Sequence, residues 1–215
     1  MPDWMPSGRR EAIRVRPICS VLVLALALAM LFGNLAHAAA ALEGTAVDKD
    51  YPINARRSNA EFQLRLLWFK QIGGSFDRVA GELRLNRPQG TAVVQASLAV
   101  DSIRMASPRL RAWVLAPEFF DAAQYPTIHF ASDPFAVNLL REGGHLSGQL
   151  RMRGVLRPVH FELAPSACTL RVPDQCVLRL HGAIERSDFG MRGHRATLSD
   201  QVELSLLVTL ESPPR

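Results

Sequence analysis

The sequence predicts an all-β protein in which about eight strands form an antiparallel sheet that closes into a barrel. Three observations support this prediction. Apolar and polar residues alternate along a series of short runs, turn-forming residues separate many of these runs, and helical spacing is confined to one interval. Closure is favoured because it removes the exposed edges of long strands, while a two-sheet sandwich is the alternative.

The predicted strands are the runs in which every second residue is apolar. The first extends from Phe62 to Trp68, and Glu61, Gln63 and Arg65 take the alternate positions. Each run would bury one face of a strand and leave the other face in water. The remaining runs lie at residues 83–85, 94–100, 146–152, 159–163, 178–184 and 202–210, with a further strand after Tyr125-Pro126.

Glycine, proline and aspartate punctuate the sequence between these runs. These residue types favour turns because they adopt or preset the backbone angles that a chain reversal needs. We therefore expect interruptions of the strands at Gly73-Gly74, Arg87–Gly90, Gly143-Gly144, Arg157-Pro158 and Ser187–Gly190.

One interval, residues 107–122, departs from the two-residue period. Ser107 followed by Pro108 is a typical helix start. Leu110, Trp113 and Val114 then follow at helical spacing. A second proline, Pro117, begins a short turn that is rich in aromatic residues. We expect this helical excursion either to plug one end of the barrel or to cover the mouth of a ligand site.

The N-terminal segment has the features of an export signal. Residues 18–35 contain no charged residue, four arginines precede them, and a small-x-small cleavage pattern ends at Ala38. We therefore interpret residues 1–38 as a secretory signal peptide, residues 39–50 as a short mature segment and residues 51–211 as the folded domain. A retained anchor is the alternative, because the apolar run approaches the roughly 20 residues that a spanning helix needs.

Composition and charge exclude several classes of protein. A chain of 215 residues with 48% hydrophobic and 21% charged residues is neither disordered nor a large multidomain protein. The formal net charge of +5 falls to +3 without residues 1–38, and the arginines are spread along the predicted strands. We therefore expect no nucleic-acid partner and, after signal cleavage, no stable membrane span.

Two cysteines, Cys168 and Cys176, remain after signal cleavage. They flank a turn signal at Pro173-Asp174, and an exported protein meets an oxidising compartment. We expect a disulfide between them, which would stabilise the fold by about 2.5 kcal/mol on the chain-entropy estimate. Two free thiols or half of a metal site are the alternatives.

An ordered set of motifs extends from Tyr51 to Glu211. Its clearest members are Tyr51–Asn54, Ala116–Asp121, Gly148–Val159 and Arg186–Met191. No single motif is specific, but the set in this order and spacing resembles the YceI-like family of periplasmic polyisoprenoid-binding proteins. The resemblance implies an extended eight-stranded antiparallel lipocalin-like β-barrel with a short helical excursion around residues 107–122. Its interior would hold a polyisoprenoid, an isoprenoid quinone or a fatty-acyl chain.

The chain departs from the family pattern in its first long strand. Arg57 stands where the family usually has a histidine before Ser58, and Leu66–Phe69 stands where the family has a second histidine. If that second histidine contacts a polar head group, its loss implies a more apolar ligand or a narrower tunnel. Alternatively, Trp68 packs inside the barrel.

The candidate ligand-binding residues are the inward-facing side chains of the predicted strands and the aromatic residues near the strand ends. Large and small side chains are mixed on this face, so the sequence pattern leaves both a tunnel and a packed core open. The candidates are Phe62, Leu64, Leu66, Phe76, Leu98, Phe119, Phe120, Phe130, Leu150, Met152, Phe161 and Phe189.

The mature sequence contains no recognised catalytic motif. A G-x-S-x-G elbow, an H-E-x-x-H helix and a glycine-rich phosphate loop are absent, and the five mature histidines lack ligand spacing. Residues 186–188 are expected to form a polar corner, through an arginine–carboxylate pair. We therefore expect no catalytic residue, no metal and no cofactor other than a bound isoprenoid or fatty-acyl lipid.

The sequence predicts a periplasmic carrier of a hydrophobic small molecule. Two alternatives remain open: a secreted structural or partner-binding barrel with a packed core and no ligand, and an accessory protein that handles quinones. A homodimer is compatible with the sequence, which does not determine the oligomeric state.

Overall fold

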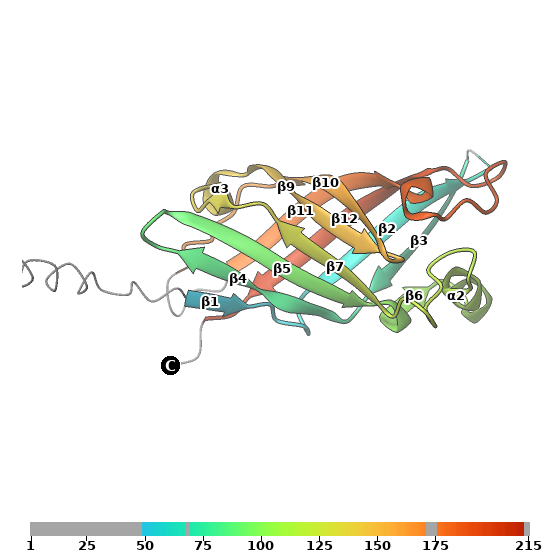
Figure 1. Cartoon of the computed structure of the whole chain (residues 1–215), viewed down its shortest axis with the longest axis horizontal. Helices are drawn as coiled ribbons and strands as arrows, with labels where there is room; N and C mark the ends of the chain where they lie inside the picture. The colour runs from blue at the N-terminus through green and yellow to red at the C-terminus, as the bar shows by residue number, and fades with distance from the viewer. Residues whose placement is uncertain (1–48, 68, 171–175, 213–215) are drawn as a thin grey trace, which may run out of the picture. The chain divides into compact units, whose positions relative to one another are not determined.

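The alternating side chains build one strongly curled antiparallel sheet (Figure 1). The computed structural model describes residues 49–67, 69–170 and 176–212; Trp68 and the segment interpreted as a signal peptide lie outside this part. The strands are β1 (Lys49–Pro52), β2 (Asn59–Leu66), β3 (Lys70–Phe76), β4 (Val79–Asn86), β5 (Thr91–Ala99), β6 (Ile103–Met105), β7 (Thr127–Ser132), β8 (Phe135–Ala136), β9 (Gly144–Met152), β10 (Val155–Leu163), β11 (Cys176–Glu185) and β12 (Gln201–Leu210).

The fold class is the predicted one, but the sheet is divided into more strands than expected. It contains 12 strands in the described residues, in the order β1-β4-β5-β7-β9-β10-β11-β12-β2-β3-β6, with β8 paired to β5. The eight predicted runs correspond to β2, β4, β5, β7, β9, β10, β11 and β12. The additional strands are β3 and the short segments β1, β6 and β8, in which the alternation is too brief or too glycine-rich to be recognised.

Two of the expected interruptions are strand residues in the structure. Gly73 and Gly74 lie inside β3, where a Cβ at Gly74 would come within 2.6 Å of the Arg104 carbonyl oxygen on β6. These glycines therefore permit a close approach between strands. Pro158 lies inside β10, which pairs with β11 only from Phe161 onward. The open edge at Pro158 tolerates a residue that has no N–H group.

The curled sheet forms a half-barrel, and a different short strand extends it at each end. At one end, β1 pairs with β4 and continues to Ile53, which forms a bridge with Leu210 of β12. At the other end, β6 follows β5 through the short helix η2 (Val100–Ser102) and pairs with β3. The divergence of β3 and β4 is therefore spanned by a short strand at each end.

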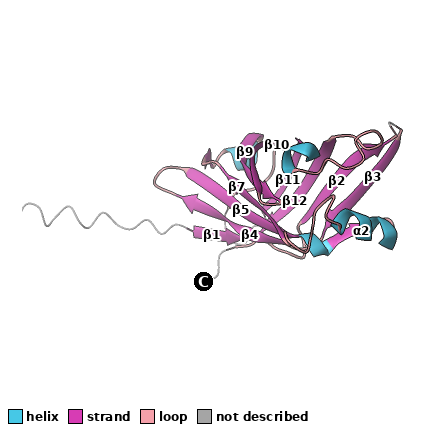
Figure 2. Ribbon diagram, turned by 45° about the vertical axis from the view of Figure 1, so that its right-hand side comes forward, coloured by secondary structure: helices cyan, strands magenta, loops and turns pink. Residues whose placement is uncertain are grey.

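Helical segments lie at opposite ends of the sheet (Figures 1 and 2). The helix α2 (Pro108–Leu115) starts as predicted, because Ser107 Oγ accepts a hydrogen bond from the Leu110 N–H at 3.2 Å and Pro108 occupies the first turn. The short helix η3 (Arg186–Phe189) precedes a loop at this same end. The helix α3 (Leu139–Glu142) lies at the opposite end. We call these the α2 end and the α3 end.

Candidate functional site

The inner face of the sheet encloses a cavity of about 170 Å³. One ordered water needs roughly 10–15 Å³. The space is therefore large enough for an organic ligand, and the barrel interior is a cavity and not a fully packed core.

The wall of this cavity is almost entirely apolar. On β12, the inward-facing Leu204, Leu206 and Val208 line it, and all three remain partly exposed. The polar wall residues in the described part of the chain are Asn59 and Glu61, whose side chains hydrogen-bond each other at an exposed position, and the buried Arg186. Such a wall offers a hydrophobic surface and few hydrogen-bonding groups to a ligand.

Ten of the twelve predicted ligand-binding residues lie on this wall. Leu66 does not: it is the last residue of β2, close to the tip of the β2–β3 hairpin, where it forms a bridge with Leu198. Phe189 does not line the cavity either: it is the last residue of η3 and is buried, 1% exposed, outside the cavity wall. The ten are Phe62, Leu64, Phe76, Leu98, Phe119, Phe120, Phe130, Leu150, Met152 and Phe161.

Two glycines on the inner face position aromatic rings against the sheet. A Cβ at Gly182 would lie 2.7 Å from Phe161 Cδ1, and a Cβ at Gly148 would lie 2.8 Å from the ring of Phe130. The two rings also meet edge to face, with centroids 5.5 Å apart. Because the rings occupy the space above glycines, large side chains line the cavity without extending fully across it.

Aromatic residues also gather at the α2 end. Phe120 contacts Phe62 and Phe76, with ring centroids 6.3 and 5.6 Å apart. In the neighbouring group, His194 stacks on Phe119 at 6.1 Å and meets Trp113 at 5.1 Å. The predicted helical excursion therefore contacts both the β2–β3 hairpin and the loop that follows η3.

Arg186 holds this loop in place. Its guanidinium is buried, and it donates hydrogen bonds to the carbonyl oxygens of Met191 at 2.6 Å, Gly193 at 2.7 Å, Ser199 at 2.9 Å and Leu198 at 3.4 Å. Burial lowers the pKa of Arg186, Asp200 opposes this change, and Arg195 adds to it. Arg186 still remains a cation because a guanidinium does not lose its proton in proteins.

The predicted polar corner is centred on Asp200. Its carboxylate lies 3.9 Å from Arg186 Nε and accepts hydrogen bonds from the N–H and the hydroxyl of Ser187 at 3.0 and 2.5 Å. Together these contacts attach the start of β12 to the end of β11.

Buried leucines line the α3 end of the cavity. Leu140, Leu163, Leu178 and Leu210 line it there, and each is at most 4% exposed. Half-buried wall residues lie at both ends, such as Met105 near the α2 end and Val208, which pairs with Leu178, near the α3 end.

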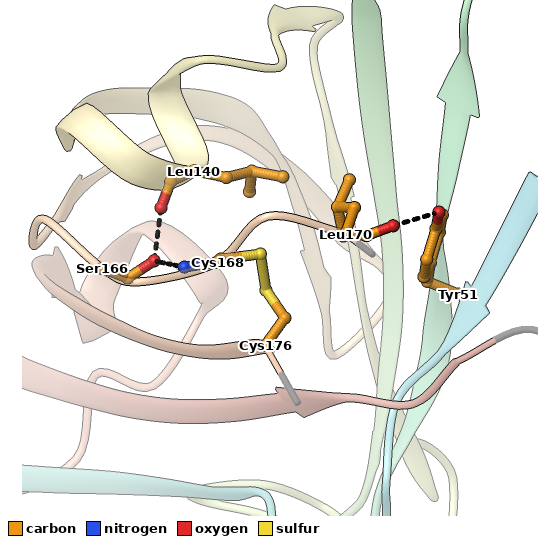
Figure 3. The surroundings of a disulfide bond; sticks show 6 residues. All are labelled: Tyr51, Leu140, Ser166, Cys168, Leu170 and Cys176. Carbon is orange, nitrogen blue, oxygen red and sulfur yellow. Dashed lines mark hydrogen bonds between the residues drawn. A yellow bond between two sulfur atoms is a disulfide. The ribbon is translucent and has the colours of Figure 1, made fainter. Parts of the chain in front are cut away.

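A disulfide lies close to α3 (Figure 3). It joins Cys168 to Cys176, and both cysteines are buried. Beside it, the Ser166 hydroxyl donates to the Leu140 carbonyl at 2.5 Å and accepts from the Cys168 N–H at 3.1 Å. On the other side, the Tyr51 hydroxyl donates to the Leu170 carbonyl at 2.9 Å. The segment between β10 and β11 is thereby attached to both α3 and β1.

Residues 51–210 match the YceI-like domain family. The chain belongs to this family. Solved structures of similar fold include BcnA from Burkholderia cenocepacia, at 15% identity and a TM-score of 0.58, covering 73% of this chain and 98% of that one. A polyisoprenoid-binding domain from Saccharophagus degradans has 14% identity and a TM-score of 0.56, with 76% and 98% covered. The Campylobacter jejuni YCEI protein has 19% identity and a TM-score of 0.56, with 66% and 85% covered. No curated protein sequence matches the chain.

Several wall residues of this YceI-like barrel were not among the sequence-based candidates. Leu204, Leu206 and Val208 belong to a recognised alternating run, so the signal was present in the sequence. Arg186 was expected only at a polar corner, and Leu140 lies on a four-residue helix with no recognisable periodicity. These two positions depend on the path of the chain at the barrel ends.

In the described part of the YceI-like domain, no group of three or more His, Cys, Asp or Glu residues could hold a metal ion. No helix among these residues is both long and apolar enough to span a bilayer.

Proposed function

We propose that this protein is a periplasmic carrier that holds one long apolar chain inside its half-barrel. The apolar cavity is the observation that carries this proposal, because its wall provides surface for a hydrocarbon and little that would bind a polar molecule. The ligand class is a polyisoprenoid, an isoprenoid quinone or a fatty-acyl lipid. The Saccharophagus degradans structure, a polyisoprenoid-binding domain, supports the choice of class.

Hydrophobic transfer would supply the binding free energy. Each CH₂ group moved from water into the cavity contributes about 0.8 kcal/mol, so ten buried groups contribute about 8 kcal/mol before the cost of association. Because the wall has few hydrogen-bonding groups, affinity should depend on chain length more than on the head group. This dependence distinguishes a hydrocarbon carrier from a protein that recognises a polar metabolite.

The two barrel ends would have different roles. The α3 end, with its buried leucines and disulfide, would form the bottom of the cavity. The ligand would enter at the α2 end, where the aromatic residues of the excursion and the loop after η3 meet. We propose no catalytic step, because the carrier function requires only burial and release of the ligand.

The experiment is to purify the full chain from the periplasm without added lipid and to analyse it by native mass spectrometry and lipid extraction. We expect one prenyl or acyl lipid per chain, and a quinone would also be visible in the ultraviolet spectrum. A protein that is empty and also fails to bind fluorescent prenyl and fatty-acyl probes would overturn the proposal.

A matched pair of variants tests whether the cavity is the binding site. Leu98→Trp places a larger side chain on the cavity wall, while Gln95→Trp adds the same side chain at an exposed position of the same strand. We expect Leu98→Trp to weaken probe binding by roughly tenfold or more, since it removes room for a few CH₂ groups. Gln95→Trp should bind as the unaltered protein does. Equal binding by both variants would place the ligand elsewhere.

A further inference from the structure

The turn between β2 and β3 exposes large apolar side chains. Phe69 is 81% exposed and Leu67 is 45% exposed, and the third exposed large hydrophobic residue in the described part of the chain is Leu156 on β10. Two of the three therefore lie in one hairpin turn. Clustered exposed apolar residues mark interaction sites more often than single ones do.

The backbone at Leu67 indicates that a leucine is not placed here for the stability of the fold. Its φ is +49°, in the left-handed region that asparagine and glycine adopt more readily than leucine does. Its side chain gains little burial in return. A leucine here is unfavourable for the turn, and its exposed side chain contributes little to the fold.

Cationic residues surround Leu67 and Phe69. Arg65 and Lys70 flank them in the hairpin, and Arg195 is exposed on the loop after η3. That loop runs alongside the turn, because the Leu67 N–H donates to the Thr197 carbonyl at 2.7 Å, and Arg65 and Arg195 line the same surface groove. Within residues 49–67, 69–170 and 176–212, none of the three cations takes part in an ion pair.

The nearby carboxylates lie away from the turn. Glu203 lines the same groove but pairs with Gln63, further from the turn along β2. Glu118 packs against Gly193, on the side of the loop that faces the helical excursion. We call Leu67 and Phe69, together with Arg65, Lys70 and Arg195, the hairpin tip.

The hairpin tip lies at the α2 end of the barrel (Figures 1 and 2). A short series of contacts connects it to the aromatic residues there: Thr197 bonds Leu67, and His194 in the same loop stacks on Phe119, which lines the cavity. The α2 end of the cavity and the hairpin tip therefore belong to one end of the molecule.

We propose that the hairpin tip docks the protein on the surface of an anionic lipid bilayer. Phe69 and Leu67 would enter the interface between head groups and acyl chains, and Arg65, Lys70 and Arg195 would contact the anionic head groups. Two protruding apolar side chains surrounded by unpaired cations fit a soft, negatively charged layer better than the broad, complementary face of a protein partner. Docking goes beyond the proposed function. Only its consequence, that the cavity of a lipid carrier opens toward the bilayer, rests on the proposed function.

Vesicle co-sedimentation of the full chain tests the proposal. We expect binding to vesicles that contain phosphatidylglycerol, weaker binding to phosphatidylcholine alone, and loss of binding as salt is raised. The double variant Leu67→Asn/Phe69→Ser should bind roughly tenfold or more weakly. Lys70→Gln/Arg195→Gln should lose about fivefold for each charge removed.

Two controls separate docking from a folding defect. Leu67→Asn should leave the thermal midpoint unchanged or raise it, because asparagine suits the left-handed backbone at this position. Leu156→Ser removes the other exposed leucine, on a strand separated from β2 by β11 and β12, and should leave vesicle binding unchanged. Equal losses in Leu156→Ser and in the hairpin-tip variant would overturn the assignment.

Failure of docking and failure of the carrier function give different results. A protein that binds prenyl or acyl probes in solution but ignores every vesicle refutes docking and leaves the carrier proposal intact. A protein that binds vesicles through Leu67 and Phe69 but takes up no probe refutes the carrier proposal and leaves docking intact. Capture of a protein partner through this tip without vesicle binding would also refute the bilayer proposal.

Discussion

Replacing Arg186 by methionine removes the donors that attach the loop after η3 to the barrel. Methionine keeps most of the length and apolar contact of the side chain but has no N–H group. The four carbonyl oxygens that Arg186 contacts would lose these hydrogen bonds. The bonds to the Met191 and Leu198 carbonyl oxygens are buried. The variant therefore tests whether a single buried cation organises the α2 end.

The magnitude follows from the number and quality of these bonds. Three are 2.9 Å or shorter, and a hydrogen bond to a charged group contributes about 1.5–3 kcal/mol, so their gross loss is about 5–9 kcal/mol. Against this loss, methionine avoids the desolvation of a guanidinium, which costs several kcal/mol. We expect a net decrease of about 3 kcal/mol in the free energy of unfolding. For a domain of this size, the midpoint should fall by about 6–12 °C.

Urea unfolding and limited proteolysis measure the global and the local effects. Arg192 and Arg195 are exposed in the loop that Arg186 holds, so trypsin should cleave after them faster in Arg186→Met. The control is Arg179→Met, which removes an exposed arginine from the preceding part of β11 and should change the free energy of unfolding by less than about 0.5 kcal/mol. The reasoning is refuted if Arg186→Met unfolds within about 1 kcal/mol of the unaltered protein and its loop is cleaved no faster.

Three further changes test the packing of other parts. Cys168→Ser/Cys176→Ser should lower the free energy of unfolding by about 2.5 kcal/mol in urea titrations, and reduction of the unaltered protein under denaturing conditions should have a matching effect. Gly182→Ala should cost about 1–3 kcal/mol because its methyl group meets the ring of Phe161, and a normal thermal midpoint would contradict this. Ser107→Ala should cost about 1 kcal/mol through loss of the cap of α2, measured by thermal unfolding, with Ser107→Asp retaining most of the stability.

The local elements could be predicted where a single period dominates. The alternating residues of β12 identify that strand, and Ser107-Pro108 identifies the start of α2, because both signals depend on neighbouring residues. Gly73-Gly74 was misinterpreted for the opposite reason. Glycine permits a turn and also permits close approach of another strand, and β6, which makes that approach, lies far along the chain.

The candidate site shows the same division. Ten of the twelve proposed ligand-binding residues lie on the cavity wall. Alternation identified those on the predicted strands, such as Phe62 and Phe161, since the face on which a side chain lies is fixed by its position in the strand. Phe119 and Phe120 lie in the helical excursion, so alternation did not place them. Leu66 keeps the alternation of β2 but lies at its last position, outside the cavity wall, and Phe189 lies on a short helix, to which alternation does not apply.

By itself, the sequence determined the all-β class, the helical excursion, the family resemblance and which side chains point inward. Tertiary structure alone decided whether the interior is packed or hollow. The same large residues could have met across the barrel, but the rings of Phe130 and Phe161 lie against glycines of neighbouring strands and leave the middle open. Cavity formation depends on which residues face one another after the strands pair, and pairing brings together positions that are distant in sequence.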